Sequence, residues 1–300
     1  MLRLGIVDLD SSHSVEFSRR FNHAGVDREQ WVDGAQVVAA WSGGSVMAPE
    51  RIPGFQAELE SIGVAIVDSR EQLMEQIDGV LILSLCGDCH LERARPFLEA
   101  KIPTFVDKPF ACSISDATAI VELAQRNETT LLNSSALRFS REVQESALKN
   151  QQLGRTNGAI TYGPAKRADG NPGLFHYGIH SVELLFELLG SGCETVSTTW
   201  SEEAEVVTGV WADGRIGTVR GNRTGVTSYG FVAYRDGGVV SETVSTRFAY
   251  RNLCREIVRT FESGQPSVPH ATNLDVVRFV LASLNSEQTG GQPVSLRDIN

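Results

Sequence analysis

The chain has 300 residues, of which 41% are hydrophobic and 21% charged, and its formal net charge is −10. This composition is typical of a globular protein with a sizeable core, and the length predicts two domains or one large one. No basic run offsets the acidic charge, which argues against nucleic acid or an anionic membrane as a partner. The longest apolar stretches, such as residues 80–85, are too short to span a bilayer.

Residues 1–132 alternate short apolar runs with stretches of helical spacing. Strands are expected over residues 2–7, 35–41, 64–67, 80–85, 104–107 and 130–132. Helices are expected over residues 14–21, 71–77, 91–100 and 115–125, with Ser69 and Ser115 as N-caps. This rhythm predicts a doubly wound parallel sheet, whose strand C-termini all lie at one edge.

After Arg141 the pattern becomes rich in strands. A helix over 143–148, a strand over 159–162, a polar loop over 163–172 and a helix over 177–189 come first. Five strands are then expected over residues 195–200, 205–211, 216–220, 229–234 and 239–244. Asp-Gly pairs at 213–214 and 236–237 predict hairpin turns. Helices over 253–263 and 274–284 end the chain.

The predicted organisation is therefore α/β, with a Rossmann-like domain over residues 1–126 and an α+β domain over residues 127–300. The second domain would hold a large, mostly antiparallel open sheet, whose uncovered face is a candidate for self-association. A ligand is expected in the crevice between the domains.

The N-terminus begins with an apolar run and lacks the features of a signal peptide, so a cytoplasmic location is expected. The five cysteines have no disulfide-rich spacing, and Cys112, Cys193 and Cys254 read as small apolar residues. Residues 86–90, Cys-Gly-Asp-Cys-His, match the c-type haem attachment string, an interpretation that would require export. No second Cys pair completes a zinc site, and no metal is expected.

Lys108 is the candidate on which the functional interpretation depends. Pro109 cannot continue a central strand, so the strand over 104–107 delivers Asp107 and Lys108 to its C-terminal edge. Ligands bind at that edge of open α/β sheets, and a crowded pocket there lowers the pKa of a lysine. The alternative is an ordinary strand-end lysine in water.

A second cluster contains His176 and His180, which share one face if the segment is helical. Gly173 and Gly178 mark places where the backbone turns or approaches something closely. One histidine would then donate or accept a proton at the point that Lys108 also serves. The alternatives are two histidines bonded to backbone or water, and a metal pair completed by Glu183.

These residues carry a resemblance to the glucose–fructose oxidoreductase / inositol dehydrogenase (Gfo/Idh/MocA) family. Asp107-Lys108-Pro109 resembles the family's Glu-Lys-Pro motif. Residues 173–184 are similar to its Gly-rich turn and catalytic helix. Three further stretches agree with family patterns, namely the spacing of residues 90–101, the pair Arg138-Phe139 and residues 286–296. The resemblance therefore spans nearly the whole chain.

The resemblance implies a nicotinamide-dependent oxidoreductase that acts on sugars, inositols or related polyols and assembles as a homodimer or homotetramer through the second sheet. Lys108 would be the catalytic lysine and His180 the catalytic histidine, with His176 beside them. The substrate would lie near Lys108, Arg138, His176 and His180. NAD or NADP would lie near Asp8, Asp10, Ser11, Ser12, His13, Ser42, Ser84, His90, Asp107 and Lys108.

His176 stands where the family has an acid, so the pocket gains positive character. We therefore expect an anionic substrate such as a sugar acid, with Lys108, His176 and Arg138 near its carboxylate. Asp107 in place of Glu is one methylene shorter and is expected to be tolerated.

The dinucleotide loop departs most from the family pattern. Asp8-Leu-Asp10-Ser-Ser-His13 replaces Gly-x-Gly-x-x-Gly, whose glycines let backbone N–H groups approach the pyrophosphate. A carboxylate ~4 Å from a phosphate costs about 4 kcal/mol at an effective dielectric constant near 20. Either the carboxylates point away, or a cation lies between, or the dinucleotide is not bound in the usual way.

Ser42 replaces the acid that usually holds the ribose of NAD, and no Arg adjoins it in sequence for a 2′-phosphate. The alternative function is a family member without dinucleotide redox chemistry. It would be a sugar-acid-binding or regulatory protein, or a metal-dependent lyase or isomerase that uses Asp8, Asp10 and His13.

Overall fold

The computed structural model describes residues 1–225 and 227–299 and divides into two compact units. Unit 1 comprises Met1–Ala111, Asp116–Ser134 and Tyr250–Val268, and unit 2 comprises Cys112–Ser115, Ser135–Ala249 and Pro269–Asn300. Because unit 1 takes in a segment from late in the chain, the predicted domains 1–126 and 127–300 stay a prediction. Among the described helices, none combines the length and apolarity that crossing a membrane requires.

Unit 1 contains the predicted parallel sheet, which is confirmed with six strands in the order β3-β2-β1-β4-β5-β6. The strands are β1 (Leu2–Val7), β2 (Ala35–Trp41), β3 (Ala65–Ile66), β4 (Gly79–Ile82), β5 (Thr104–Val106) and β6 (Leu131–Asn133). All four residues of β4 and all three of β5 are buried, as expected for strands covered on both faces. The sheet order reverses between β1 and β4, which places a ligand-binding switch point at their C-terminal ends.

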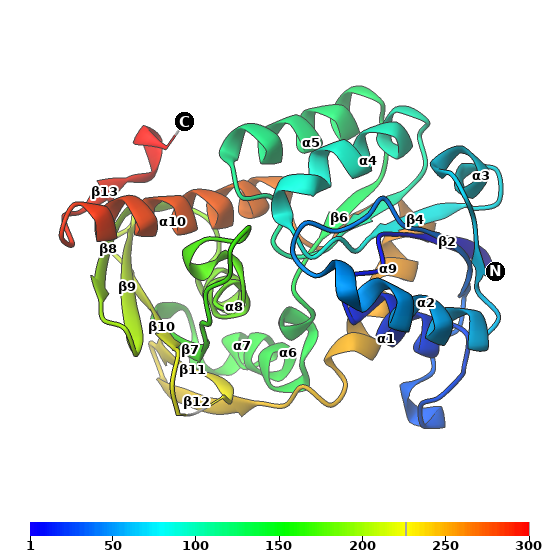
Figure 1. Ribbon diagram of the computed structural model, residues 1–300. Coiled ribbons are helices and arrows are strands. Elements are labelled where there is room, and N and C mark those ends of the chain that lie inside the picture. The colour runs from blue at the N-terminus through cyan, green and yellow to red at the C-terminus, as the bar shows by residue number, and fades with distance from the viewer. Residues whose placement is uncertain (226, 300) are drawn as a thin grey trace. The chain divides into compact units, whose positions relative to one another are not determined.

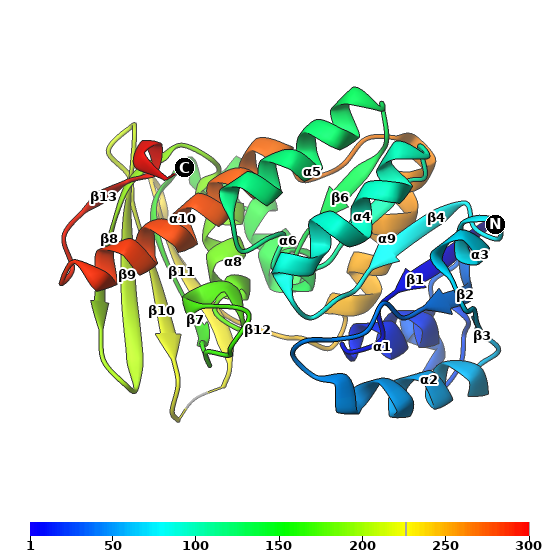
Figure 2. The ribbon, with the colours of Figure 1, turned by 45° about the horizontal axis from the view of Figure 1, so that its top comes forward.

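Helices cover both faces of this sheet (Figures 1 and 2). They are α1 (His13–Phe21), α2 (Ile52–Ser61), α3 (Arg70–Met74), α4 (His90–Glu99), α5 (Ile114–Arg126) and α9 (Ala249–Ser263). The sequence did not predict α2, because Pro53 and Gly54 lie in its first turn. Ser69 caps α3 as predicted, but α5 begins before Ser115, which is therefore not its cap.

Helix α9 (Ala249–Ser263) packs on the sheet of unit 1, although the preceding segment of unit 1 ends at Ser134 and residues 135–248, 114 in all, lie between them. Gly79 of β4 makes room for it, because a Cβ there would lie 2.7 Å from the ring of Phe261. Leu253, Cys254 and Ile257 are fully buried on the same helix. The helix therefore completes the core of unit 1.

Unit 2 contains a seven-stranded sheet in the order β12-β11-β7-β10-β9-β8-β13. Its strands are β7 (Thr156–Pro164), β8 (Cys193–Trp200), β9 (Ala204–Trp211), β10 (Ile216–Asn222), β11 (Tyr229–Arg235), β12 (Gly238–Val244) and β13 (Val294–Ser295). Only β7 and β10 pair in parallel, so the prediction of a mostly antiparallel sheet is confirmed. Strand β7 runs to Pro164, into the stretch predicted as a loop.

Helices α8 (Ile179–Leu189) and α10 (His270–Gln288) pack against one face of this sheet (Figure 1). The short helices α6 (Arg141–Leu148) and α7 (Asn150–Leu153) come before the first strand of this sheet, β7, in the chain. The opposite face exposes apolar side chains on neighbouring strands, among them Val210, paired with Ile216, and Tyr234. Such a face suits self-association, and the predicted homodimer or homotetramer stays a prediction.

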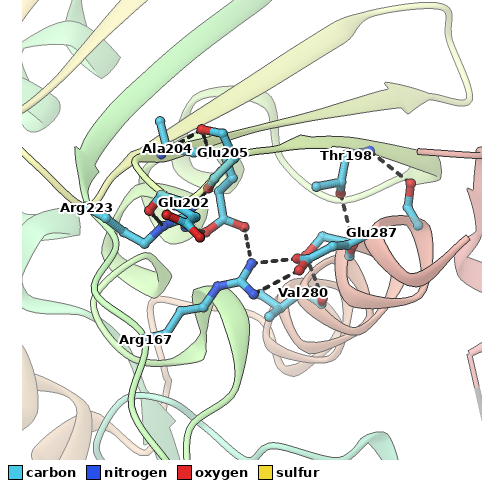
Figure 3. Close-up of polar contacts among 11 residues, drawn as sticks. Arg167, Thr198, Glu202, Ala204, Glu205, Arg223, Val280 and Glu287 are labelled. Carbon is cyan, nitrogen blue, oxygen red and sulfur yellow. Dashed lines mark hydrogen bonds and ion pairs between the residues drawn. The ribbon is translucent and has the colours of Figure 1, made fainter. Parts of the chain in front are cut away.

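A buried carboxylate, Glu205 of β9, joins distant parts of unit 2 (Figure 3). Its side chain is only 2% exposed and lies between the guanidinium groups of Arg167 and Arg223. Arg167 also pairs with Glu287 of α10, and both arginines lie over the ring of Trp200. The cluster therefore ties the loop after β7 to β9, β10 and α10.

We expect Glu205→Gln to lower the free energy of unfolding of the protein by about 3 kcal/mol, because it leaves two partly buried guanidinium groups facing a neutral amide. The measurement is urea unfolding followed by circular dichroism. Glu194→Gln, which removes the exposed partner of Arg297, is the matched control and should cost less than about 1 kcal/mol. Equal losses in the two variants would contradict a special role for the buried cluster.

Candidate functional site

The C-terminal edge of the parallel sheet is lined with polar residues. Asp8 and Asp10 follow β1, Ser42 follows β2, Ser84 follows β4, and Asp107 and Lys108 follow β5. The polar residues that the sequence assigned to this edge in unit 1 therefore stand at strand ends, as the crossover rule requires.

Asp8 is the centre of the hydrogen-bond network at this edge, with a residue exposure of 1%. Its Oδ1 accepts from the backbone N–H of Gly43 at 2.7 Å, and its Oδ2 accepts from the hydroxyl of Ser84 at 2.6 Å. Arg93 of α4 completes the set, with Nε 3.0 Å from Oδ2. The carboxylate is therefore turned inward and neutralised by a cation.

The backbone of Asp8 has a φ of 68°, in the left-handed region that favours glycine. Aspartate tolerates this region better than most residues, because its short polar side chain bonds locally. The turn after β1 is therefore made without the first glycine of the family pattern.

Asp10 is also turned into the protein. The hydroxyl of Ser45 donates to its Oδ2 at 2.6 Å, and the backbone N–H of Leu85 donates to its Oδ1 at 3.0 Å. Burial raises the pKa of Asp10, and the charge of Asp8 adds to this, while the two hydrogen bonds act in the opposite direction. The carboxyl group therefore does not present a bare negative charge to the outside.

Ser11 caps the start of α1. Its hydroxyl accepts from the N–H of His13 at 3.3 Å, and its carbonyl accepts from the N–H of Ser14 at 3.2 Å. Ser12 precedes the helix without a side-chain capping bond. Two of the N–H groups that a helix N-terminus offers to an anion are thus already used.

His13 and Asp107 form a buried pair, with Nδ1 of His13 2.5 Å from Oδ2 of Asp107. The imidazole stacks on Phe17 and meets the ring edge of Tyr250. Burial by itself raises the pKa of Asp107, but the charge and hydrogen bond of His13, with the charge of Lys108, outweigh it and hold the pKa at about 2. Asp107 is therefore a stable carboxylate.

His90 begins α4 and is completely buried. Its Nε2 lies 2.9 Å from the carbonyl oxygen of Ser84, and its Nδ1 lies 3.2 Å from that of Phe110. These contacts hold the loops after β4 and β5 in place, so His90 supports the C-terminal edge of the sheet without facing solvent. They leave no ring nitrogen directed at a haem, and the haem interpretation of residues 86–90 has no support.

Lys108 is half-buried at the tip of β5, and within the described residues no carboxylate forms an ion pair with its ammonium group. The strand end that carries it is fixed by Asn133 of β6, whose amide donates to the carbonyls of Val106 at 2.8 Å and Asp107 at 3.1 Å. The lysine therefore leaves the backbone from a well-defined position.

In unit 2, His180 lies in the first turn of α8 and is half-buried. Its Nδ1 is 2.6 Å from the hydroxyl of Ser135, which also accepts from the N–H of Leu137 at 3.2 Å. In the tautomer that carries its proton on Nδ1, the ring donates to this hydroxyl oxygen, which has two lone pairs, and Nε2 of the neutral ring is unprotonated. The ring also meets the edge of Tyr229.

His176 does not share a helix face with His180, which corrects the sequence-based prediction. The helix begins at Ile179, and His176 has a φ of −75° and a ψ of −96°, outside the helical region. Gly178 explains the irregular entry, because a Cβ there would lie 3.0 Å from the backbone of Leu174. The i, i+4 argument, and the metal pair built on it, therefore fail.

Arg138 was expected near a substrate carboxylate, but its surroundings give it another role. The guanidinium is 2% exposed, with Nε 2.7 Å from Glu183 and Nη1 2.9 Å from Glu187. Glu183 also accepts from the backbone N–H of Ser135 at 2.7 Å. Arg138 and Glu183 thus hold the Ser135 segment against α8 and position His180.

A pocket of about 270 Å³ opens in unit 2 beside Tyr177. It is close to the lower end of the volumes that hold small ligands. It is lined by Pro164, Lys166, Tyr177, Asn222, Arg223, Thr224, Gly225 and Thr227.

Asp8, Asp10 and His13 each bond to a different partner and do not converge on one point. In residues 1–225 and 227–299, no three His, Cys, Asp or Glu side chains group as a metal ion would require.

Sequence reasoning missed Arg93, Asn133 and Ser135. Asn133 ends strand β6 and Ser135 stands two residues after it, so the strand-end rule applied to Lys108 would also have found them. Arg93 carries no local signal, because it lies mid-helix and reaches Asp8 across 85 residues of sequence.

Comparison with known families and structures matches part of the chain to a family and the whole chain to a fold. Residues 18–134 match the GFO_IDH_MocA family model, described as an oxidoreductase family with an NAD-binding Rossmann fold. The match begins after the loop over residues 8–13, so the degenerate loop lies outside it.

Several solved structures share the fold. A probable dehydrogenase from Thermotoga maritima has 17% identity, covers 100% of both chains and gives a TM-score of 0.82. A scyllo-inositol dehydrogenase from Lactobacillus casei with bound NAD(H) and scyllo-inositol has 13% identity, covers 99% of this chain and 100% of its own, and gives 0.83. An oxidoreductase from Agrobacterium radiobacter in complex with NAD+, L-tartaric acid and magnesium has 15% identity, covers 100% and 99%, and gives 0.77.

At these identities the structural matches show the fold, and the family model supplies the assignment. Residues 18–134 are thus assigned to the Gfo/Idh/MocA oxidoreductase family, whose NAD-binding Rossmann fold they match.

Proposed function

We propose that the protein is an NAD- or NADP-dependent oxidoreductase that transfers a hydride to or from a hydroxyl-bearing carbon of a sugar, polyol or sugar acid. The observation that carries the proposal is Lys108, an ammonium without a carboxylate partner among the described residues, held at the C-terminal edge of a Rossmann sheet. Two structural relatives hold NAD together with scyllo-inositol or L-tartaric acid. The second of these ligands motivates the anionic substrate.

In this proposal Lys108 stabilises the negative charge that develops on the substrate oxygen as its proton leaves. His180 accepts or returns that proton through Nε2, because Ser135 occupies Nδ1. When bound, a nicotinamide dinucleotide supplies the hydride acceptor or donor. Arg138 and Glu183 act through Ser135 as positioning residues, and His176 adds positive character near the substrate.

The residues at the sheet edge fit a dinucleotide in turn geometry and in charge. Asp8 supplies the left-handed turn, and both carboxylates of the loop are paired inside the protein. The repulsion expected from the sequence is therefore absent. Ser11, Ser12, Ser42 and Lys108 are the residues that would hold phosphate and ribose groups.

The choice between NAD and NADP is influenced by Arg93, which the sequence did not place near the end of β2. Its Nη2 donates to the carbonyl of Gly43 at 2.9 Å, and its guanidinium lies over the ring of Trp41. Asp8 already pairs with this cation, so it offers little charge for a 2′-phosphate. The geometry thus leaves both dinucleotides as candidates.

A second candidate function is a family member that binds a sugar acid without dinucleotide redox chemistry. It is favoured by the bonds between the loop after β1 and the loop after β4, namely Asp8 to Ser84 and Asp10 to Leu85. These bonds cross the switch point where a dinucleotide usually binds and use one hydroxyl and one N–H donor there. Direct binding separates the two functions.

We expect NADH or NADPH to quench the tryptophan fluorescence of the purified protein saturably. Trp41, at the end of β2, is the tryptophan nearest in the fold to the proposed site, so Trp41→Phe should lose most of the quenching. Trp200→Phe, in the sheet of unit 2, is the matched control and should keep it. Absence of binding by both dinucleotides, in fluorescence and in thermal shift, would reject this proposal in favour of the second candidate.

Lys108→Ala should lower kcat by about 10²-fold or more, because it removes the group that stabilises the developing oxyanion. The affinity for NADH should change little. Turnover is measured on a panel of sugar acids and neutral sugars, with Lys149→Ala as the matched control, since that lysine pairs with Glu242 at the surface. Unchanged turnover would dismiss the role of Lys108, and turnover of neutral sugars alone would dismiss the anionic substrate.

The pair of His13 and Asp107 predicts a pH-dependent stability. The pKa of Asp107 is about 2 in the folded protein against 3.8 as the ordinary value, so the pair stabilises the fold above pH ~4 and this contribution is lost as the pH falls towards 2. His13→Gln removes the partner that holds down the pKa of Asp107, and we expect it to lower the free energy of unfolding by about 2 kcal/mol above pH ~4 and progressively less below that pH.

Urea unfolding of wild type and variant at several pH values gives this difference. His23→Gln is the control, because His23 is partly exposed and faces the exposed carboxylate of Asp33. A loss that stays constant with pH would show that His13 contributes only packing.

A further inference from the structure

The proposed function leaves Cys86 and Cys89 unused, although they stand at the same edge of the parallel sheet. Strand β4 ends at Ile82, a 3₁₀ turn spans Gly87–Cys89, and α4 begins at His90. A Cys-x-x-C pair between a strand and a helix has the spacing of redox-active dithiols.

The backbone holds the two residues within reach of a disulfide. The N–H of Cys89 donates to the carbonyl of Cys86 at 3.2 Å. An i to i+3 turn of this kind keeps the two Cα atoms less than about 7 Å apart, close to the range that a disulfide requires. The two thiols also hydrogen-bond to each other. Closing the bond therefore needs only a small movement of the side chains.

The surroundings of the pair favour one thiolate. The hydrogen bond from the Cys89 thiol lowers the pKa of Cys86 to about 7 against the effect of burial, and the backbone N–H groups of Asp88 and Cys89 add to this. The pKa of Cys89 is raised in turn, because that thiol gives its hydrogen to Cys86. By contrast, burial raises the pKa of Cys193 to about 12 and also raises that of Cys254.

The two sulfurs differ in access. Cys86 is 4% exposed, whereas Cys89 is partly exposed and is the sulfur that an incoming molecule meets. When Cys86 is a thiolate, Cys89 holds the one proton that the two sulfurs share. Moving this proton from Cys89 to Cys86 makes the sulfur of Cys89 the nucleophile.

We propose that Cys86 and Cys89 form a redox-active dithiol that closes to an intramolecular disulfide by exchange with a small-molecule disulfide. The proton of Cys89 passes to Cys86 as the Cys89 sulfur attacks the incoming disulfide, which forms a mixed disulfide and expels one thiolate. That thiolate takes the proton of Cys86. The Cys86 thiolate then attacks the Cys89 sulfur and expels the second thiolate, which is protonated by water.

The balance is two cysteine thiols oxidised to one disulfide and one small disulfide reduced to two thiols. The chemistry does not depend on the substrate or on the dinucleotide, so its failure would leave the proposed function untouched.

The test equilibrates the full chain with glutathione and glutathione disulfide at a series of ratios. Samples are quenched in acid, denatured and alkylated, and the peptide that contains both cysteines is analysed by mass spectrometry. We expect its internal disulfide to rise with the proportion of glutathione disulfide and to reverse with dithiothreitol, while Cys112, Cys193 and Cys254 stay alkylated.

Cys86→Ser should instead retain glutathione on Cys89, because no second thiolate remains to expel it, and Cys112→Ser is the control that should behave as wild type. Circular dichroism reports whether each variant is folded, and the wild-type measurement decides the proposal if one is not. Full alkylation of both cysteines at every ratio would overturn it. A glutathione adduct on wild-type Cys89 that never yields the internal disulfide would overturn it as well.

Discussion

The carboxylate of Asp8 lies buried at the tip of β1, where an unpaired negative charge would be costly. Its three partners are Gly43 after β2, Ser84 after β4 and Arg93 of α4, and the left-handed backbone of Asp8 itself makes the turn towards α1. One side chain thus fixes the relative positions of the segments that line the switch point of the sheet. The rest of the edge can be understood as built around this one neutralised charge.

Neutralisation continues along the edge. Asp10 is turned to Ser45 and Leu85, and Asp107 is paired with His13, so the acidic residues that replace the usual glycines face the protein. Lys108 is the contrast, because no carboxylate in the described part of the chain forms an ion pair with it. A positive group that is well placed and not internally paired is what a reaction with a developing oxyanion requires.

The positions of the strands that end at this edge could be predicted from sequence because they rest on local rules. Apolar runs of strand length alternated with helical spacing, and Pro109 marked where β5 had to stop. The contacts of Asp8 and Asp10 could not be predicted, since they join residues 35 to 85 positions apart and depend on side-chain direction. His176 was misplaced for a local reason, because the turn at Gly178 delays the start of α8 and breaks the helical spacing.

The same limit applied to α2, whose Pro53 and Gly54 are poor helix residues in isolation. It also applied to Arg138, whose carboxylate partners Glu183 and Glu187 lie about 45 positions or more away in the sequence. In each case packing decided what propensity left open.

Helix α9 has a consequence for how the polypeptide matures. The ring of Phe261 fills the space beside Gly79. A ribosome must therefore synthesise nearly nine-tenths of the chain before α9 can cover the parallel sheet. Until then the nascent N-terminal portion exposes the apolar surface of the sheet that α9 later covers, and chaperones recognise surfaces of this kind. Expression of this portion alone, ending before α9, would yield unit 1 without the helix that completes its core. A circular permutant that joins α9 directly to β6 would contain every segment of that unit.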